Sequence, residues 1–148
     1  MALRTLAVDF NSYFASCEMQ ERPELRGRPV GIVPVMAETT CCIAASREAK
    51  ARGVKVGTGV AEARALCPDI VMVEQRPALY IGYHHRLLAE IEACIHVTNI
   101  KSIDEVECDL TATFAPREKA LAVARQIKER VARQVGACLT SSIGIAPI

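Results

Sequence analysis

Ser102-Ile103-Asp104-Glu105-Val106-Glu107-Cys108-Asp109-Leu110 places four acidic residues within six positions and interleaves them with apolar residues. The alternation from Val106 to Leu110 predicts a half-buried β-strand. Asp104 and Glu105 are adjacent, and adjacent side chains in a regular strand point to opposite faces. The two can serve one site if they lie where the pleat ends, at a hairpin turn. Carboxylate oxygens gathered there suit a hard cation such as Mg²⁺, and the alternative is a solvated face with acids at its turn.

A further acidic residue, Asp9, follows a β-type run from Leu3 to Val8 that predicts a central strand. Asn11 or Ser12 can cap the helix expected to follow. We therefore expect Asp9 at the carboxyl end of a strand, just before a helix N-terminus whose free N–H groups can bind a phosphate. A plain capping role for Asp9 is the alternative.

A basic cluster surrounds a second short helix, which is expected to begin after Ser46 and to stop at Gly53. Arg47 and Lys50 are three positions apart and share one face of this helix. The pattern fits a clamp for polyphosphate, and it also fits an exposed basic helix.

From residue 70 onward the expected order is strand, long helix, two short strands, long helix and strand. Joined to the first strand, this order predicts a sheet covered by two helices, with a smaller lobe inserted before residue 70. The long helices are expected over 78–95 and 117–135. The period of the first predicts an inner face made of Leu79, Gly82, Leu87, Ile91 and Ile95.

The composition is that of an ordinary globular domain, with 51% hydrophobic residues, 24% charged residues and a net charge of +1. This charge gives no electrostatic signal for nucleic-acid binding. The seven cysteines form no C-x-x-C pair, so most are expected to be small buried residues in a reducing cytosol. The vicinal pair Cys41-Cys42 is the one redox candidate. No segment approaches the ~20 apolar residues of a membrane span, so we expect a cytoplasmic protein without membrane association.

Four segments together resemble, in order and spacing, the motifs of the Y-family, translesion DNA polymerases over essentially the whole chain. They are Val8–Glu18 for the first motif, Arg47–Gly57 for the fingers motif, Ser102–Thr111 for the acidic palm motif, and Ser142–Ala146 for the start of the next motif.

The details are similar to the UmuC branch, the catalytic subunit of bacterial DNA polymerase V. Asn11 stands where many family members have a second Asp, and Cys17 follows an Ala-Ser pair. Arg47 and Lys50 stand where other members have Tyr and Arg, which leaves the phosphate-clamping role to the residues present.

The resemblance implies an α+β fold, in which a polymerase palm with a ferredoxin-like βαββαβ core carries a small inserted fingers lobe. The palm is expected over residues 1–11 and 75–148, and the fingers over 12–74. Family members continue into thumb and little-finger domains, which we do not expect within these 148 residues. We therefore expect an N-terminal catalytic fragment with little or no polymerase activity of its own.

The implied reaction is template-directed nucleotidyl transfer from a dNTP to a primer 3′-OH by a two-metal mechanism, in DNA damage tolerance and the SOS response. Asp9, Asp104 and Glu105 would be the catalytic ligands of two Mg²⁺ ions, with the backbone carbonyl of Phe10 completing the nucleotide-side ion. Glu107 and Asp109 are expected to be solvent-facing or structural.

The implied nucleotide site lies at the start of the first helix. The N–H groups at Tyr13 and Phe14 would meet the triphosphate, and the Phe14 ring would exclude a ribose 2′-OH as a steric gate. Arg47 and Lys50 would grip the β- and γ-phosphates.

Primer-template DNA and dNTP are the implied partners of the full-length protein, with a sliding clamp and mutasome accessory proteins as further partners. Two rival interpretations are a nucleotidyl cyclase on a similar palm, and a non-catalytic polymerase-like subunit that acts through protein contacts in a repair complex. The basic fingers helix and Phe14 favour the polymerase over the cyclase. The presence of Asp9, Asp104 and Glu105 argues against the non-catalytic subunit.

Overall fold

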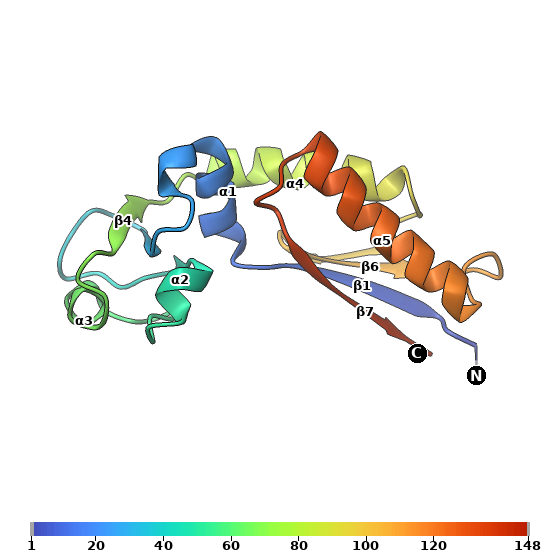
Figure 1. Cartoon of the computed structure of the whole chain (residues 1–148), viewed down its shortest axis with the longest axis horizontal. Helices are drawn as coiled ribbons and strands as arrows, with labels where there is room; N and C mark the ends of the chain where they lie inside the picture. Colours follow the sequence, from blue (N-terminus) through green and yellow to red (C-terminus); the bar gives the residue numbers. More distant parts are fainter. Residues whose placement is uncertain (1, 148) are drawn as a thin grey trace. The chain divides into compact units, whose positions relative to one another are not determined.

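The computed structural model describes residues 2–147, and the chain divides into two compact units. Unit 1 consists of Met1–Asn11 and Tyr80–Ile148, and unit 2 consists of Ser12–Leu79. Each unit contains its own sheet (Figure 1). None of the helices formed by residues 2–147 combines the length and the apolar character that a membrane crossing needs.

Unit 1 is built on a four-stranded antiparallel sheet with the strand order β5-β6-β1-β7. Its strands are β1 (Thr5–Phe10), β5 (Asn99–Ser102), β6 (Glu105–Asp109) and β7 (Ser141–Ala146). Helix α4 (Pro77–Glu92) precedes β5, and helix α5 (Arg117–Gln134) lies between β6 and β7. This βαββαβ order confirms the predicted α+β fold with a ferredoxin-like core.

One face of this sheet carries the core of unit 1. Leu6, Val8 and Phe10 alternate along β1 and are buried, which is the period expected of a strand with one covered face. Figure 1 shows α4 and α5 on the same side of the sheet. Because these side chains point to the covered face, the residues between them, including Asp9, point to the other face.

The inner face of α4 differs from the prediction. The buried residues of α4 are Tyr80, Tyr83, Leu87 and Ile91, while Gly82 is exposed. Leu87, Ile91 and Ile95 are buried as predicted, but in the first half of the helix the buried positions are shifted by one residue, to Tyr80 and Tyr83. The physical reason is that two tyrosine rings bury far more area than Leu79 and a glycine at the alternative positions.

Unit 2 contains a three-stranded sheet in the order β3-β2-β4. Strand β2 (Val30–Val33) pairs in parallel with β4 (Val71–Glu74) and antiparallel with the two-residue β3 (Ala44–Ala45). The helices of this unit are α1 (Tyr13–Glu21), the short 3-10 helix η1 (Pro23–Leu25), α2 (Arg47–Lys50) and α3 (Val60–Leu66).

A buried carboxylate anchors α1 within unit 2. Glu18 is fully buried, and its two oxygens accept hydrogen bonds from Arg76, from Nε at 3.1 Å and from Nη2. Arg22 approaches the same carboxylate at 3.9 Å. Since a buried charge is costly unless it is paired, Arg76 ties α1 to the segment that precedes α4.

Candidate functional site

Strands β5 and β6 form a hairpin whose two-residue turn is Ile103-Asp104. Ser102 pairs with Glu105 across this turn. Asp104 therefore lies in the turn and Glu105 opens β6, which is the placement required if adjacent acids are to serve one site. The Ser102 hydroxyl donates a hydrogen bond to Oδ1 of Asp104 at 2.8 Å and holds that carboxylate at the turn.

Strand β1 brings Asp9 to the same end of the hairpin. Asp9 is the direct pairing partner of Glu105, and the Phe10 N–H donates to the carbonyl oxygen of Asp104 at 2.9 Å. Residues directly opposite each other in an antiparallel pair point to the same face. Asp9 and Glu105 are both exposed, so their carboxylates lie together on the open face of the sheet.

The donor chemistry of these three residues fits Mg²⁺. Asp9, Asp104 and Glu105 supply only oxygen, the ligand type that this cation prefers. Within residues 2–147, however, no group of three or more His, Cys, Asp or Glu side chains is close enough to hold a metal ion as it stands. The fold thus brings the three positions together, while the Asp104 carboxylate is directed to the Ser102 hydroxyl.

Glu107 and Asp109 lie on the same face of β6, farther from the turn. Their pairing partners on β1 are Ala7 and Thr5. Oxygen Oε1 of Glu107 accepts a hydrogen bond from Asn99 at 3.3 Å, and its Oε2 lies 3.5 Å from the Lys101 ammonium. These contacts give Glu107 a structural role.

Ser12 precedes α1 in a left-handed backbone conformation, with φ 46° and ψ 51°. It is the one non-glycine residue with a positive φ in the described range 2–147. Its side chain makes no capping hydrogen bond, so the predicted cap is wrong for Ser12. The reason is that a capping side chain normally requires an extended backbone at this position.

The amide of Asn11, the other predicted cap, forms two hydrogen bonds within unit 1. Its Nδ2 donates to the Thr140 hydroxyl at 3.3 Å, and its Oδ1 accepts from the Ser142 hydroxyl at 3.2 Å. These two bonds tie the end of β1 to β7 and its approach. An aspartate at this position could not donate to Thr140, so the amide suits this arrangement.

The predicted nucleotide-binding residues all lie in unit 2. The Tyr13 side chain is buried, and that of Phe14 is partly exposed, with 6.0 Å between the two ring centroids. Arg47 and Lys50 are exposed on α2. Ser46 caps α2 as predicted, because its hydroxyl accepts a hydrogen bond from the Ala49 N–H at 3.3 Å.

Sequence reasoning missed two hydroxyl groups near these residues. The Ser102 hydroxyl forms a hydrogen bond to Asp104. The position of Ser102, two residues before Asp104 at an expected turn, could have predicted this bond, since serine side chains at turns often form hydrogen bonds with nearby residues. Ser12 accepts a hydrogen bond from the Lys50 ammonium at 2.9 Å. No local pattern connects two residues 38 positions apart.

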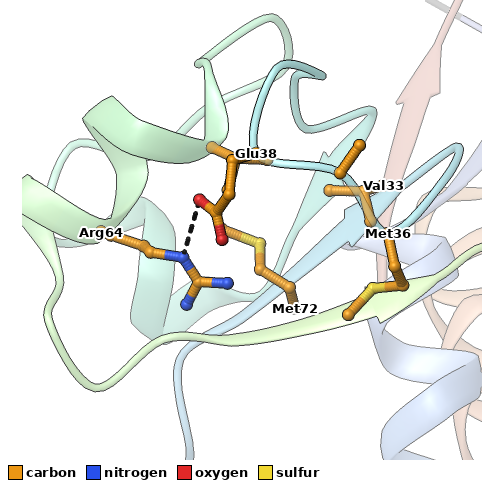
Figure 2. Close-up of a pocket in the computed structure, with 7 residues that line it drawn as sticks. Val33, Met36, Glu38, Arg64 and Met72 are labelled. Carbon is orange, nitrogen blue, oxygen red and sulfur yellow. Dashed lines mark hydrogen bonds and ion pairs between the residues drawn. The ribbon is translucent and has the colours of Figure 1, made fainter.

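A pocket of about 110 Å³ lies in unit 2. Figure 2 shows its wall, where the Arg64 guanidinium donates to Glu38 at 3.3 Å beside Met36 and Met72. None of the predicted site residues lines it. The pocket is therefore not the site that the sequence predicted.

The cysteines provide no activated thiol pair. Cys41 is exposed, whereas Cys42 is buried and its burial raises the pKa of its thiol. Burial also raises the pKa of Cys17 to about 12 and that of Cys108 to about 11. A redox-active pair needs a lowered pKa, so the raised pKa of Cys42 argues against a redox role for Cys41-Cys42.

We predict that iodoacetamide at pH 8 labels Cys41 of the native chain first and leaves Cys17 and Cys108 unmodified. The thiolate is the reactive form, and a raised pKa together with burial removes it at this pH. Peptide mass spectrometry after short labelling times measures the order. The Cys41→Ser variant should lose the fastest phase, and rapid labelling of Cys17 in the folded protein would contradict the prediction.

Residues 8–148 match the model of the impB/mucB/samB family. The chain belongs to this family. The resemblance to Y-family polymerases is thereby confirmed, and membership covers both units, since the match runs from β1 to the end of the chain.

Relatives in this family carry the name DNA polymerase IV. The chain is 38% identical to DNA polymerase IV of Moorella thermoacetica over 144 residues, which are 96% of this chain and 36% of that protein. It is 33% identical over 152 residues to DNA polymerase IV of Neisseria meningitidis, covering 97% of this chain and 40% of that protein. The chain thus spans well under half the length of these relatives.

Solved structures of Y-family polymerases have the same fold. The structure of DinB from Sulfolobus solfataricus matches with a TM-score of 0.88 and 26% identity, over 97% of this chain and 42% of that one. A Y-family polymerase chimera of Dbh and Dpo4 matches with a TM-score of 0.89 and 25% identity, over the same shares of the two chains.

Proposed function

We propose that this chain is the N-terminal catalytic part of a translesion DNA polymerase that transfers nucleotides from dNTP to a primer 3′-OH under the direction of a template. The observation that carries the proposal is the pairing of Asp9 with Glu105 on one exposed sheet face, with Asp104 at the adjoining turn. The similarity to DNA polymerase IV proteins over almost the whole chain supports it.

In this proposal unit 1 is the palm and unit 2 is the fingers. The division of the chain after Asn11 supports the assignment of residues 1–11 to the palm. The second boundary between the two compact units lies between Leu79 and Tyr80, inside α4. The boundary expected between fingers and palm, at residue 75, lies just before that helix.

The proposed palm holds two Mg²⁺ ions. Asp9 and Asp104 would contact both ions, Glu105 the catalytic one, and the Phe10 carbonyl the nucleotide-side one. When bound, such a pair stabilises the attacking 3′-oxygen and the leaving pyrophosphate. The protein's own contribution is to orient these ligands, since phosphoryl transfer is mostly positioning and charge neutralisation.

The proposed fingers bind the incoming nucleotide. Tyr13 and Phe14 occupy the first turn of α1, where backbone N–H groups favour a phosphate. The burial of the Tyr13 ring supports a role through its backbone. Arg47 and Lys50 are exposed cations on α2 and would contact the β- and γ-phosphates.

The partners in this proposal are dNTP and primer-template DNA, with a sliding clamp and mutasome proteins as accessory factors in damage tolerance. The narrower UmuC-like assignment rests on Asn11, Arg47 and Lys50 and stays a prediction. The relatives described above are named DNA polymerase IV, so the proposal is made for the Y-family as a whole.

A chimaera tests the proposal. This chain would replace the matching residues of Moorella thermoacetica DNA polymerase IV, which supplies the remaining length. We expect template-directed primer extension with dNTP and Mg²⁺. A chimaera that folds and binds primer-template DNA as the parent does, but extends no primer, would contradict the proposal.

In the same chimaera, Phe14→Ala should raise ribonucleotide incorporation relative to deoxyribonucleotide incorporation by about 10- to 100-fold, because removing a clash removes the discrimination against the extra hydroxyl. Single-nucleotide insertion kinetics with paired dNTP and rNTP measure the ratio. Phe14→Tyr keeps the ring and serves as the matched control, which should retain the discrimination. Equal ratios in both variants would show that Phe14 is not the gate.

A further inference from the structure

The Ser12 side chain has one polar partner whose position in the sequence is distant. Its Oγ accepts a hydrogen bond from the Lys50 Nζ at 2.9 Å, and both residues belong to unit 2. Ser12 immediately precedes α1, and Lys50 is the last residue of α2. The bond therefore connects the end of one short helix to the start of another.

The backbone of Ser12 explains why its hydroxyl is available to Lys50. Its left-handed conformation leaves the side chain without a capping bond to α1, while its carbonyl still accepts the first helical hydrogen bond from the Ser16 N–H at 2.8 Å. The helix thus begins without help from the hydroxyl. The hydroxyl instead accepts from an exposed ammonium, which is an uncommon use of a serine at this position.

The hydrogen bond to Ser12 restricts the Lys50 side chain and positions its ammonium group. A lysine ammonium sits on a four-carbon stem with several rotatable bonds, so holding it in one place costs entropy. The hydrogen bond to Ser12 meets part of that cost before any ligand arrives, and it places the charge at the residue that leads into Tyr13 and Phe14.

We propose that Ser12 is a positioning residue for nucleotide binding, whose hydroxyl holds the Lys50 ammonium at the start of α1 to receive the terminal phosphates of a triphosphate. This inference rests on the proposed function, which assigns the phosphates to Lys50 and to the first turn of α1. Ser12 acts through Lys50, and its neutral hydroxyl leaves the full positive charge available to the anion.

The charge of the side chain at position 12 should determine how strongly a substitution weakens triphosphate binding. An aspartate tolerates the left-handed conformation and could also hold the ammonium, but it would neutralise Lys50 and repel a phosphate. Ser12→Asp should therefore weaken triphosphate binding more than Ser12→Ala. A role limited to tethering Lys50 would predict the reverse order.

The experiment titrates the 148-residue chain with inorganic tripolyphosphate and, separately, with Mg²⁺·dNTP, followed by amide chemical shifts. Ser12→Ala should weaken binding of both probes about three- to fivefold, the effect of one exposed charge-assisted hydrogen bond. Lys50→Ala should weaken it about tenfold. In the Lys50→Ala background, Ser12→Ala should have no further effect, because the two residues act as one unit.

Ser12→Gly separates the hydroxyl from the backbone. Glycine accepts a positive φ without strain, so this variant loses the hydroxyl while relieving the conformational cost that Ser12→Ala retains. Equal losses of affinity in the two variants support the role of the hydroxyl. Amide spectra without ligand verify that each variant is folded.

The outcomes distinguish the inference from the proposed function. Normal affinity in Ser12→Ala with weak binding in Lys50→Ala overturns the inference alone, as does an additional loss in the double variant. Normal affinity in Lys50→Ala removes Lys50 from the proposed nucleotide site, and the inference with it. A wild-type chain that binds neither probe overturns the nucleotide-binding proposal itself.

Discussion

Asp104→Asn should lower the rate of nucleotidyl transfer in the polymerase chimaera by about 10²- to 10³-fold, the amount expected when several kcal/mol of metal-based charge stabilisation is lost. The asparagine keeps the size of the side chain and an oxygen that can accept the Ser102 hydrogen bond. The Phe10 N–H bond to residue 104 involves only the backbone carbonyl and is unaffected. The variant therefore removes a charge while leaving the turn intact.

The measurement is single-turnover primer extension, accompanied by Mn²⁺ titration of the 148-residue chain. Asp9→Asn and Glu105→Gln should behave like Asp104→Asn. Glu107→Gln is the matched control, since it removes the same charge from the same face of β6. It should change the rate less than threefold, because Lys101 already pairs with the Glu107 carboxylate. Similar losses in all four variants would mean that general negative charge, not a metal site, determines the rate.

Arg76→Ala should destabilise the chain by about 3 kcal/mol, because it removes the arginine that pairs with the buried Glu18 carboxylate. Glu18 is 0% exposed, and the Arg22 guanidinium lies 3.9 Å from its carboxylate. Urea denaturation followed by circular dichroism measures the change in the free energy of unfolding. Adding Glu18→Gln to Arg76→Ala should recover part of the loss, since a neutral amide costs less to bury than a charge.

A second ion pair in unit 2 provides the control. Arg52 bonds to Asp69, but both side chains are about half exposed, at 47% and 57%. Solvent screens such a pair, so Arg52→Ala should cost much less than Arg76→Ala. If the two arginine variants lose the same stability, burial of Glu18 is not the source of the Arg76 effect.

Local sequence patterns correctly predicted those strands and turns whose formation depends mainly on residues close together in the sequence. The alternation from Val106 to Leu110 predicted β6. The adjacency of Asp104 and Glu105 indicated a turn if both acids serve one site, because a regular pleat would have separated them. Local patterns failed on the first half of α4. Two neighbouring sets of positions both repeat near 3.6 residues there, and packing of the larger rings chose between them.

The sequence by itself determined the family, the α+β order of the elements and the acidic residues at the strand ends, because these follow from motifs and periodicity. Only the tertiary structure decided that Asp9 faces Glu105 and that Ser12 meets Lys50. Strand register is set by long-range burial: Val8 opposite Val106 completes the core only in this alignment, and Asp9 is then placed beside the acidic turn. Contacts between distant residues depend on that folded geometry, which no local pattern encodes.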